Sequence, residues 1–411
     1  MEVAIVGGGI CGLSLALNLK ERGVACRVYE RAPEIKPLGV GITLLPHAMR
    51  EFSALGLGDE LLKAGIENRE CCFFNRFGQL IYREDRGKFA GYPFPEVGIH
   101  RGNLHVILHQ AVQKRLGLDA VITDCECVGV DQDERGATLH FKQTSTGKGR
   151  DSVRADVVIA CDGINSALRR QFYPNDKIAF SGINTWRGVT RRKPILGGRT
   201  YMRVGSILTG KMVIYPIVDD VDGKGNQLIN WMAEIKRDTT EQNDWNKPGN
   251  LADFFPLYES WRFDWLDVAQ MIRDADQILE YPMVDKDPID RWIFGRVALA
   301  GDAAHPMYPR GSNGAAQAAI DARTLADLLR KKPDTREALT AYEAERAGPA
   351  AKVVRTTREQ TPDFSNIRVE ELVGDKPFDN LDKYITQDEL RALSENYKSI
   401  AGFALADVAG R

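Results

Sequence analysis

Alternating patterns of hydrophobic and polar residues open the chain. Residues 2–6 form a short apolar run, the glycine-rich segment 7–12 follows, and an amphipathic stretch then extends to Arg22. A second apolar run ends on Glu30. This order predicts a strand, a tight turn, a helix and a second strand.

The pattern changes near residue 180. Before this point, helical spacing alternates with apolar runs, and residues 155–160 form a continuous apolar run typical of a buried parallel strand. Beyond it, alternating aromatic-rich runs predict an antiparallel sheet. The expected strands of that sheet are 201–208, 211–218 and 226–235, and the main expected helices of the chain are 44–57, 101–116, 313–330, 335–358 and 387–398.

These elements predict a mixed α/β protein in which a Rossmann-like domain is interrupted by an inserted antiparallel-sheet domain. The expected bounds are residues 1–75, 96–178 and 278–360 for the first domain and 76–95 and 179–277 for the second. Residues 361–411 are expected to form a helical or irregular tail. Packing, an oligomer contact and a flexible extension all remain open roles for it.

The glycine-rich segment has the spacing of a dinucleotide site. Gly7 permits a tight turn, Gly9 lets a pyrophosphate approach the backbone at a helix N-terminus, and Gly12 lets the helix pack closely on the strand. Glu30, at the end of the second strand, is placed to accept hydrogen bonds from an adenosine ribose. A glycine-rich loop without a ligand is the alternative, and it leaves Glu30 unexplained.

Composition narrows the class of protein. The 411 residues include 55 Lys and Arg against 57 Asp and Glu, a net charge of -2, so no overall field favours nucleic acid or an anionic membrane. No apolar run approaches the roughly 18 residues of a spanning helix, and the first strand begins too early to leave room for a signal peptide. We therefore expect a cytoplasmic protein without a membrane or nucleic-acid partner.

The seven cysteines are an odd number in a long chain, which argues against a disulfide framework. Neither the pair Cys71–Cys72 nor the pair Cys125–Cys127 has the spacing of a redox dithiol or a zinc knuckle. His105 and His109 lie one helical turn apart, but no third ligand is evident. We expect no metal site.

Two further motifs follow expected strands. The segment 162–169 (DGINSALR) begins with Asp-Gly, and the segment 301–306 (GDAAHP) begins with Gly-Asp and precedes a glycine-rich helix start at 311–314. Together with residues 7–30, these motifs resemble those of the FAD-dependent aromatic hydroxylases, the single-component class A monooxygenases. The resemblance extends to about residue 355 and implies a Rossmann-like FAD-binding domain.

The resemblance also implies a set of cofactor contacts. Asp302 would bind a ribityl hydroxyl, and the helix after Gly311 would direct its positive end at the flavin N1–C2 carbonyl. The alternatives are an N-cap carboxylate for Asp302, a local ion pair for Asp162 and Arg169, and a solvated helix-start side chain for Arg101. The implied FAD-binding residues are Gly7, Gly9, Ile10, Cys11, Gly12, Glu30, Arg31, Gly41, Arg101, Val128, Asp162, Arg169, Asp302, Gly311, Ser312, Asn313, Gly314 and Ala315.

Four short segments resemble the phenazine-carboxylate hydroxylase branch, with salicylate and 3-hydroxybenzoate hydroxylases as more distant relatives. They are 37–42 (PLGVGI), 185–189 (TWRGV), 281–285 (YPMVD) and 302–309 (DAAHPMYP). The resemblance implies that a planar phenazine-like or hydroxybenzoate-like substrate is hydroxylated with O2 through a flavin C4a-hydroperoxide. It also implies noncovalent FAD, with NADH or NADPH as a transient reductant. A monomer and a homodimer both remain open.

Oxygen transfer from a flavin needs little acid–base chemistry, so no catalytic residue is predicted. Arg187, Tyr215 and Tyr281 are candidates for contact with a substrate carboxylate or phenol; the alternative is that they are ordinary sheet residues. A plain NAD dehydrogenase would leave the motifs at 162–169 and 301–306 unexplained. A noncatalytic flavin-binding sensor, or a flavin oxidoreductase of this fold with a nonaromatic substrate, would retain every motif.

Overall fold

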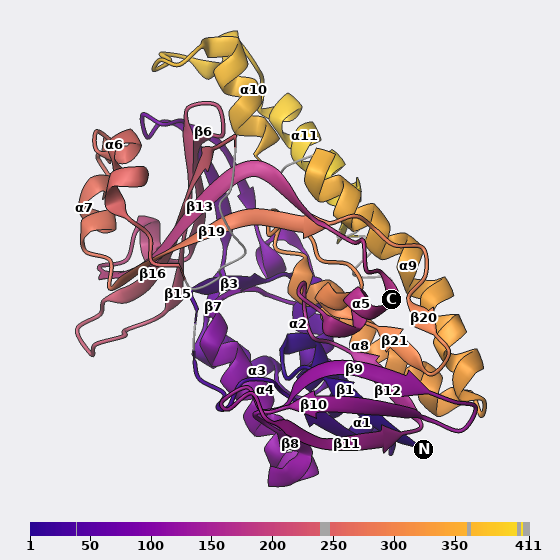
Figure 1. Ribbon diagram of the computed structural model, residues 1–411. Coiled ribbons are helices and arrows are strands. Elements are labelled where there is room, and N and C mark those ends of the chain that lie inside the picture. Colours follow the sequence, from indigo (N-terminus) through magenta and orange to yellow (C-terminus); the bar gives the residue numbers. More distant parts are fainter. Residues whose placement is uncertain (38, 239–246, 360–362, 401–403, 406–411) are drawn as a thin grey trace.

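The computed structural model describes residues 1–37, 39–238, 247–359, 363–400 and 404–405. Two sheets dominate it: a mainly parallel sheet near the N-terminus and a larger sheet that contains β13 and β19 (Figure 1). The expected mixed α/β architecture is therefore observed.

The first sheet is centred on β1, which pairs in parallel with β2 and β12. Its strands, in spatial order, are β20 (Ile293–Phe294), β21 (Val297–Leu299), β12 (Val157–Ala160), β1 (Glu2–Val6), β2 (Ala25–Tyr29) and β8 (Val121–Ile122). Helix α1 (Ile10–Glu21) is buried from Cys11 to Leu19 because it packs against α4 (Arg101–Leu116) and α8 (Gly314–Lys331). The carboxyl ends of β1, β12 and β21 thus place three motif turns at one edge of this sheet.

The larger sheet is antiparallel except where β14 pairs with β5. Its strands, in spatial order, are β19 (Gln277–Lys286), β13 (Ile178–Arg192), β16 (Gln227–Lys236), β15 (Gly210–Val218), β14 (Thr200–Ser206), β5 (Glu70–Phe74) and β6 (Leu80–Asp85). Its outer face buries Trp186 and Trp231 in a core shared with α6 (Phe255–Tyr258) and α7 (Val268–Arg273). The inner face carries Tyr201, Val213 and Tyr215, which belong to a separate buried core.

Smaller elements connect these layers. The other strands are β3 (Gly41–Leu44), β4 (Ile66–Asn68), β7 (Glu96–His100), β9 (Glu126–Gln132), β10 (Ala137–Lys142), β11 (Gly149–Ala155), β17 (Arg262–Phe263) and β18 (Leu266–Asp267), and the other helices are α2 (Pro46–Ala54), α3 (Gly58–Ala64), α5 (Ala167–Phe172) and α9 (Thr335–Glu359). The backbone N–H of Gly41, on β3, donates to Asn230 Oδ1 of the larger sheet at 2.7 Å, so the two layers meet there. None of the described helices is long and apolar enough to cross a membrane.

The tail folds onto the larger sheet. Helix α10 (Phe364–Val373), which the sequence did not predict, and helix α11 (Gln387–Ile400) are the yellow helices beside β6 in Figure 1. Val369, Val373 and Leu390 share a buried core with residues of the inner face. Strands β5 and β19, which the expected bounds assign mostly to the FAD-binding domain, are hydrogen-bonded members of the larger sheet. The division into domains itself stays a prediction.

Candidate active site

The turn between β1 and α1 is shaped by its glycines. Gly7 has φ +103°, and a Cβ built on it would overlap the carbonyl oxygen of Cys161. A Cβ on Gly12 would overlap the carbonyl oxygen of Gly7, whereas a Cβ on Gly9 would meet nothing within 4 Å. Gly7 and Gly12 are therefore required by the fold, while the backbone at Gly9, the N-cap of α1, lies open to a ligand.

Glu30 lies against the same turn. Its Oε2 accepts a hydrogen bond from the Gly8 N–H at 2.6 Å, and its Oε1 accepts one from the Ala32 N–H at 2.8 Å. The carbonyl of Gly8 is also in contact with His105 Nε2 at 2.6 Å. The sequence indicates only that His105 and His109 lie one helical turn apart. Its contact with a residue almost a hundred positions away leaves no local signal in the sequence.

The other residues implied for the adenosine half of FAD surround this turn. Ile10 and Cys11 form the first turn of α1, with Cys11 buried and Ile10 partly exposed. Arg31 is exposed just after Glu30.

Val128 lies at an irregularity in the pairing of β9 with β10, and its side chain is 52% exposed. Its neighbours Cys127 and Gly129 pair with adjacent residues of β10, so Val128 has no strand partner there. Its backbone is thus available to a ligand such as an adenine.

Asp162 and Arg169 do not pair with each other. Asp162 Oδ2 accepts a hydrogen bond from the Ala167 N–H at 2.8 Å, and its Oδ1 is buried with no hydrogen-bond partner in the described part of the chain. Burial raises the pKa of Asp162, although the hydroxyl of Ser166 and nearby backbone N–H groups oppose this rise. The alternative of a local ion pair between Asp162 and Arg169 is therefore not observed.

Arg169 is fully buried, and its guanidinium is committed to protein atoms. Its Nε donates to Asp176 at 2.8 Å, while its Nη1 donates to the carbonyls of Ala303 and Ala304 at 3.2 and 2.9 Å. The guanidinium is thus bound to protein atoms and is not directed at the cofactor, the contact that the resemblance implied. Arg169 instead fixes the backbone just after Asp302.

Asp302 and Arg101 are both exposed, and the charge of Arg101 acts on the carboxylate of Asp302. Asp302 is exposed, and it makes no side-chain hydrogen bond among the described residues, so the N-cap alternative is not observed. The surrounding protein desolvates its carboxylate and raises the pKa of Asp302, while the charges of His305 and Arg101 act in the opposite direction. A carboxylate held this way is free to accept hydrogen bonds from sugar hydroxyls.

The turn into α8 has an unusual backbone. Gly311 and Ser312 have φ +78° and +58°, and Asn313 then caps the helix that begins with Gly314 and Ala315. Buried Asn313 contacts His47 Nε2 through its Oδ1 at 3.1 Å. The first N–H groups of α8 have no partners within the helix, so its N-terminus offers a site for developing negative charge.

Arg187, Tyr215 and Tyr281 come together although they belong to β13, β15 and β19. The guanidinium carbon of Arg187 lies 5.1 Å from the centre of the Tyr281 ring. Burial lowers the pKa of Arg187, and Arg101 adds to this through like-charge repulsion. Burial also raises the pKa of Tyr215 to about 12. Among the described residues Arg187 has no ion pair, and its buried Nε has no hydrogen-bond partner.

These features fit FAD. The open backbone at Gly9 suits a pyrophosphate, the carboxylate of Asp302 suits a ribityl chain, and the N-terminus of α8 suits the flavin carbonyl. No group of three or more metal-ligating side chains occurs in the described ranges. All seven cysteines are free thiols.

Comparison with known proteins agrees with this geometry. The family described as the FAD binding domain matches residues 1–197 and 274–357. Phenazine 1,6-dicarboxylic acid hydroxylase of Lysobacter antibioticus is 38% identical over 364 residues, which cover 87% of this chain and 89% of that protein. The 3-hydroxybenzoate 6-hydroxylase of Polaromonas naphthalenivorans is 29% identical over 387 residues, which cover 91% of this chain and 90% of that protein.

Solved structures show the same fold. A substrate complex of salicylate hydroxylase has a TM-score of 0.74 and 22% identity, covering 100% of this chain and 97% of its own. HpxO of Klebsiella pneumoniae, in complex with FAD and uric acid, has a TM-score of 0.76 and 22% identity, covering 100% of this chain and 97% of the HpxO chain. The resemblance found in the motifs is confirmed: the chain belongs to the FAD-dependent aromatic monooxygenases.

Proposed function

We propose that this monooxygenase hydroxylates a planar aromatic acid, with phenazine-like heteroaromatic carboxylates as the leading class. NADH or NADPH serves as a transient reductant. The observation that carries the proposal is the unpaired cation of Arg187, held between Tyr215 and Tyr281 on the inner face of the larger sheet.

The guanidinium of Arg187 is partly buried and has no counter-charge among the described residues, and desolvation of an ion in a protein is costly unless a partner offsets it. A carboxylate can accept two parallel hydrogen bonds from arginine and remove that cost. The rings of Tyr215 and Tyr281 provide flat surfaces beside the cation. Arg187 therefore suits the acidic group of an aromatic ligand.

FAD, when bound, would carry electrons from NADH or NADPH to O2 and so activate the oxygen. The residues of this chain would bind and orient: Asp302 would accept hydrogen bonds from the ribityl chain, the N-terminus of α8 would stabilise negative charge, and Arg187 would fix the acid group of the substrate. The proposed reaction requires that water be excluded from the cleft.

The names of the similar proteins support an aromatic acid as substrate, since they refer to phenazine and hydroxybenzoate acids. The seven free cysteines support the cytoplasm, where thiols stay reduced. A noncatalytic sensor of the same fold would bind an aromatic acid without turning it over. A monomer and a homodimer are equally compatible with the proposal.

A ligand panel tests the proposal. Phenazine, quinoline, salicylate and hydroxybenzoate acids are compared for stimulated NAD(P)H oxidation and for a hydroxylated product by mass spectrometry. Arg187→Met should raise KM for the active acid by about tenfold or more, as expected for loss of a charged hydrogen-bonding partner. Arg191→Met, on the same strand but exposed, is the matched control. Stimulation by nonaromatic compounds alone would refute the substrate class, and peroxide without product would identify the acids as effectors.

A further inference from the structure

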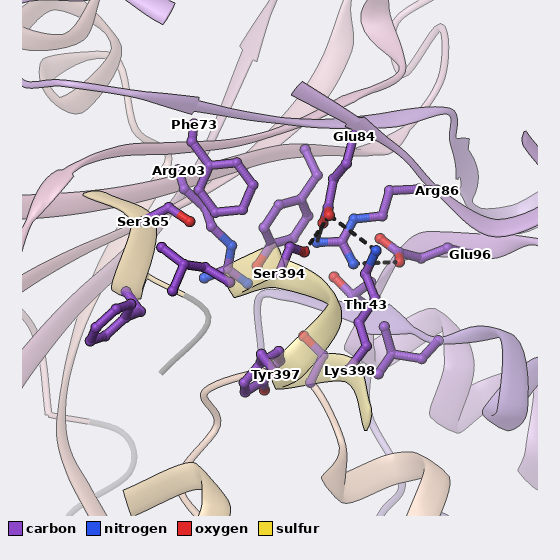
Figure 2. Close-up of a pocket in the computed structure, with 16 residues that line it drawn as sticks. Thr43, Phe73, Glu84, Arg86, Glu96, Arg203, Ser365, Ser394, Tyr397 and Lys398 are labelled. Carbon is purple, nitrogen blue, oxygen red and sulfur yellow. Dashed lines mark hydrogen bonds and ion pairs between the residues drawn. The ribbon is translucent and has the colours of Figure 1, made fainter. Parts of the chain in front are cut away.

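Two clusters of buried charged side chains lie near the turns that are expected to hold the flavin. The first lies under the tail, where Glu84 pairs with Arg86 and with Lys398 (Figure 2). These contacts join α11 to β6, so this cluster anchors the tail. The second cluster is centred on Asp321 and contacts the turn that carries Asp302.

Asp321 is a buried carboxylate on α8 with partners from separate parts of the chain. Its Oδ2 accepts a hydrogen bond from the Gly301 N–H at 3.0 Å and lies 2.6 Å from His305 Nε2. Its Oδ1 accepts a hydrogen bond at 2.7 Å from Nε of Arg346, on α9. Arg346 Nη2 also donates to Gln317 Oε1 at 2.7 Å. Both oxygens of Asp321 are thus bound to groups of the protein.

The charges of this cluster are enclosed. Asp321 has no exposed surface, and His305 and Arg346 are 2% and 6% exposed. Burial alone would raise the pKa of Asp321, but the charges of His305 and Arg346 outweigh it and hold that pKa well below its usual range. Asp321 therefore stays ionised at neutral pH and keeps its contacts with the turn.

The turn that carries Asp302 is fixed on both sides. Gly301, which precedes it, has φ +57° and donates its N–H to Asp321. The carbonyls of the two residues that follow Asp302 accept hydrogen bonds from Arg169, and the side chain of His305 then contacts Asp321. The backbone around Asp302 is therefore held in place while its own carboxylate stays exposed.

Asp321 acts on Asp302 by charge as well as by position, and the two effects have opposite signs. Burial raises the pKa of Asp302, and the negative charge of Asp321 raises it further. Loss of that charge would favour ionised Asp302, which accepts hydrogen bonds more strongly than the neutral acid. Charge alone thus predicts equal or tighter binding of a ligand after removal of Asp321. Loss of position predicts weaker binding, because the ligand would have to order the turn.

We propose that Asp321 is a positioning residue for FAD: it holds the turn that presents Asp302 to the ribityl chain. His305 and Arg346 keep the Asp321 carboxylate in place. The inference rests on the proposed role of Asp302 as a ribityl ligand and is independent of the identity of the aromatic substrate. It gives the buried ion pair between α8 and α9 a function in cofactor retention.

The test is the rate at which FAD leaves the holoprotein, followed by the flavin fluorescence that appears after dilution. Asp321→Ala/Arg346→Met removes the carboxylate together with its guanidinium partner, and we expect it to release FAD about fivefold faster or more. In an Asp302→Ala background, the same double substitution should change the release rate by less than about twofold, because no carboxylate is left to position. Asp327→Ala/Arg22→Met removes another ion pair of α8 and should not change the release rate in either background.

A milder variant repeats the test if Asp321→Ala/Arg346→Met does not fold with FAD. His305→Leu removes one contact with Asp321 and leaves the ion pair with Arg346 intact. It should also release FAD faster, and only when Asp302 is present. His305→Gln, which can still donate a hydrogen bond to the carboxylate, should restore slow release.

The outcomes separate a positioning role from a structural one. Equal acceleration with and without Asp302 would show that Asp321 supports only the fold, and it would overturn the inference, as would unchanged release. If Asp302→Ala alone releases FAD as slowly as the wild type, Asp302 is not a ribityl ligand, and the inference fails with that assignment. Release of FAD does not depend on hydroxylation of an aromatic acid, so failure of the proposed substrate class would leave these results unchanged.

Discussion

Asp363 accepts a hydrogen bond at 2.7 Å from Arg203, a residue 160 positions earlier in the chain. Both side chains are buried, and Lys211 shares the same carboxylate. Burial alone would raise the pKa of Asp363, but the charges of Lys211 and Arg203 outweigh it and hold that pKa well below its usual range. The start of the tail is thus joined electrostatically to the centre of the larger sheet.

Replacement of this carboxylate should destabilise the protein. Asp363→Asn leaves two buried cations with one fewer anion, a change that costs about 3–5 kcal/mol in comparable buried pairs. Because the folded pKa is depressed, the carboxylate contributes stability above its unfolded pKa of about 3.9, and this contribution is lost as pH falls below that value. Thermal unfolding should show a lower midpoint for Asp363→Asn than for the wild type at pH 7. Between pH 4 and pH 3, the midpoint of Asp363→Asn should fall less than that of the wild type. Equal midpoints at pH 7 would contradict the role of the pair.

The tail illustrates what the sequence could not predict. The helical spacing of residues 387–398 predicted α11 closely, because its apolar positions recur locally. The pairing of Asp363 with Arg203 depends on chain segments far apart in sequence, so no local pattern indicates it. Helix α10 was missed for a related reason: its stability comes from packing on the inner face rather than from its own periodicity.

Arg169 shows the same limit within a motif. The spacing of Asp162 and Arg169 correctly located a turn after a parallel strand, but it did not specify the direction of each side chain. Asp176, Ala303 and Ala304 satisfy the guanidinium, and two of these belong to a segment more than a hundred residues away. The glycine turn was more predictable, since the constraints on Gly7 and Gly12 arise from the strand–turn–helix unit and its parallel neighbour.

Two alanine substitutions in the glycine turn should have different effects. Gly12→Ala would force a Cβ into the Gly7 carbonyl, so we expect loss of stability and of FAD. In Gly9→Ala the added methyl group has open space, so the variant should fold with nearly the wild-type unfolding temperature. It should retain FAD poorly, because the methyl group would point where a pyrophosphate approaches. FAD content and thermal unfolding of both variants distinguish these cases. Full FAD retention by Gly9→Ala would place the pyrophosphate elsewhere.

Asp302 should contribute to FAD affinity without contributing to folding. Asp302→Ala removes a charge-assisted hydrogen bond worth roughly 1.5–3 kcal/mol, or about ten- to a hundredfold in the dissociation constant of FAD. Asp290→Ala, which changes an exposed carboxylate upstream on the same segment, is the control. Fluorescence titration of the apoprotein measures both. Unchanged affinity in Asp302→Ala would show that this carboxylate is not a ribityl ligand, and a colourless protein that never binds FAD would contradict the family-level conclusion.

The buried side chain of His47 should make the stability of the protein depend on pH. Burial lowers its pKa to about 4, although its contact with Asn313 acts in the opposite direction. The unfolded chain therefore takes up this proton at higher pH than the folded protein, so stability should fall as pH decreases from about 6.5 to 4. His47→Gln, which retains a polar partner for Asn313, should flatten that part of the stability profile. Parallel profiles for the two proteins would show that His47 does not titrate as its environment indicates.

Reduction of the flavin should depend on the aromatic acid. The chain has one dinucleotide-binding glycine motif, which FAD occupies in this family, so we expect NADH or NADPH to bind only transiently. The positive charges of Arg101 and Arg187 repel each other, and an acid group that binds Arg187 would offset this repulsion and order the site. Anaerobic stopped-flow mixing should therefore show slow reduction without an aromatic acid and an acceleration of about tenfold or more with one. Arg187→Met should lose this acceleration while keeping the slow basal rate. Rapid reduction in the absence of any aromatic, with no further increase on its addition, would show that the substrate does not control electron entry.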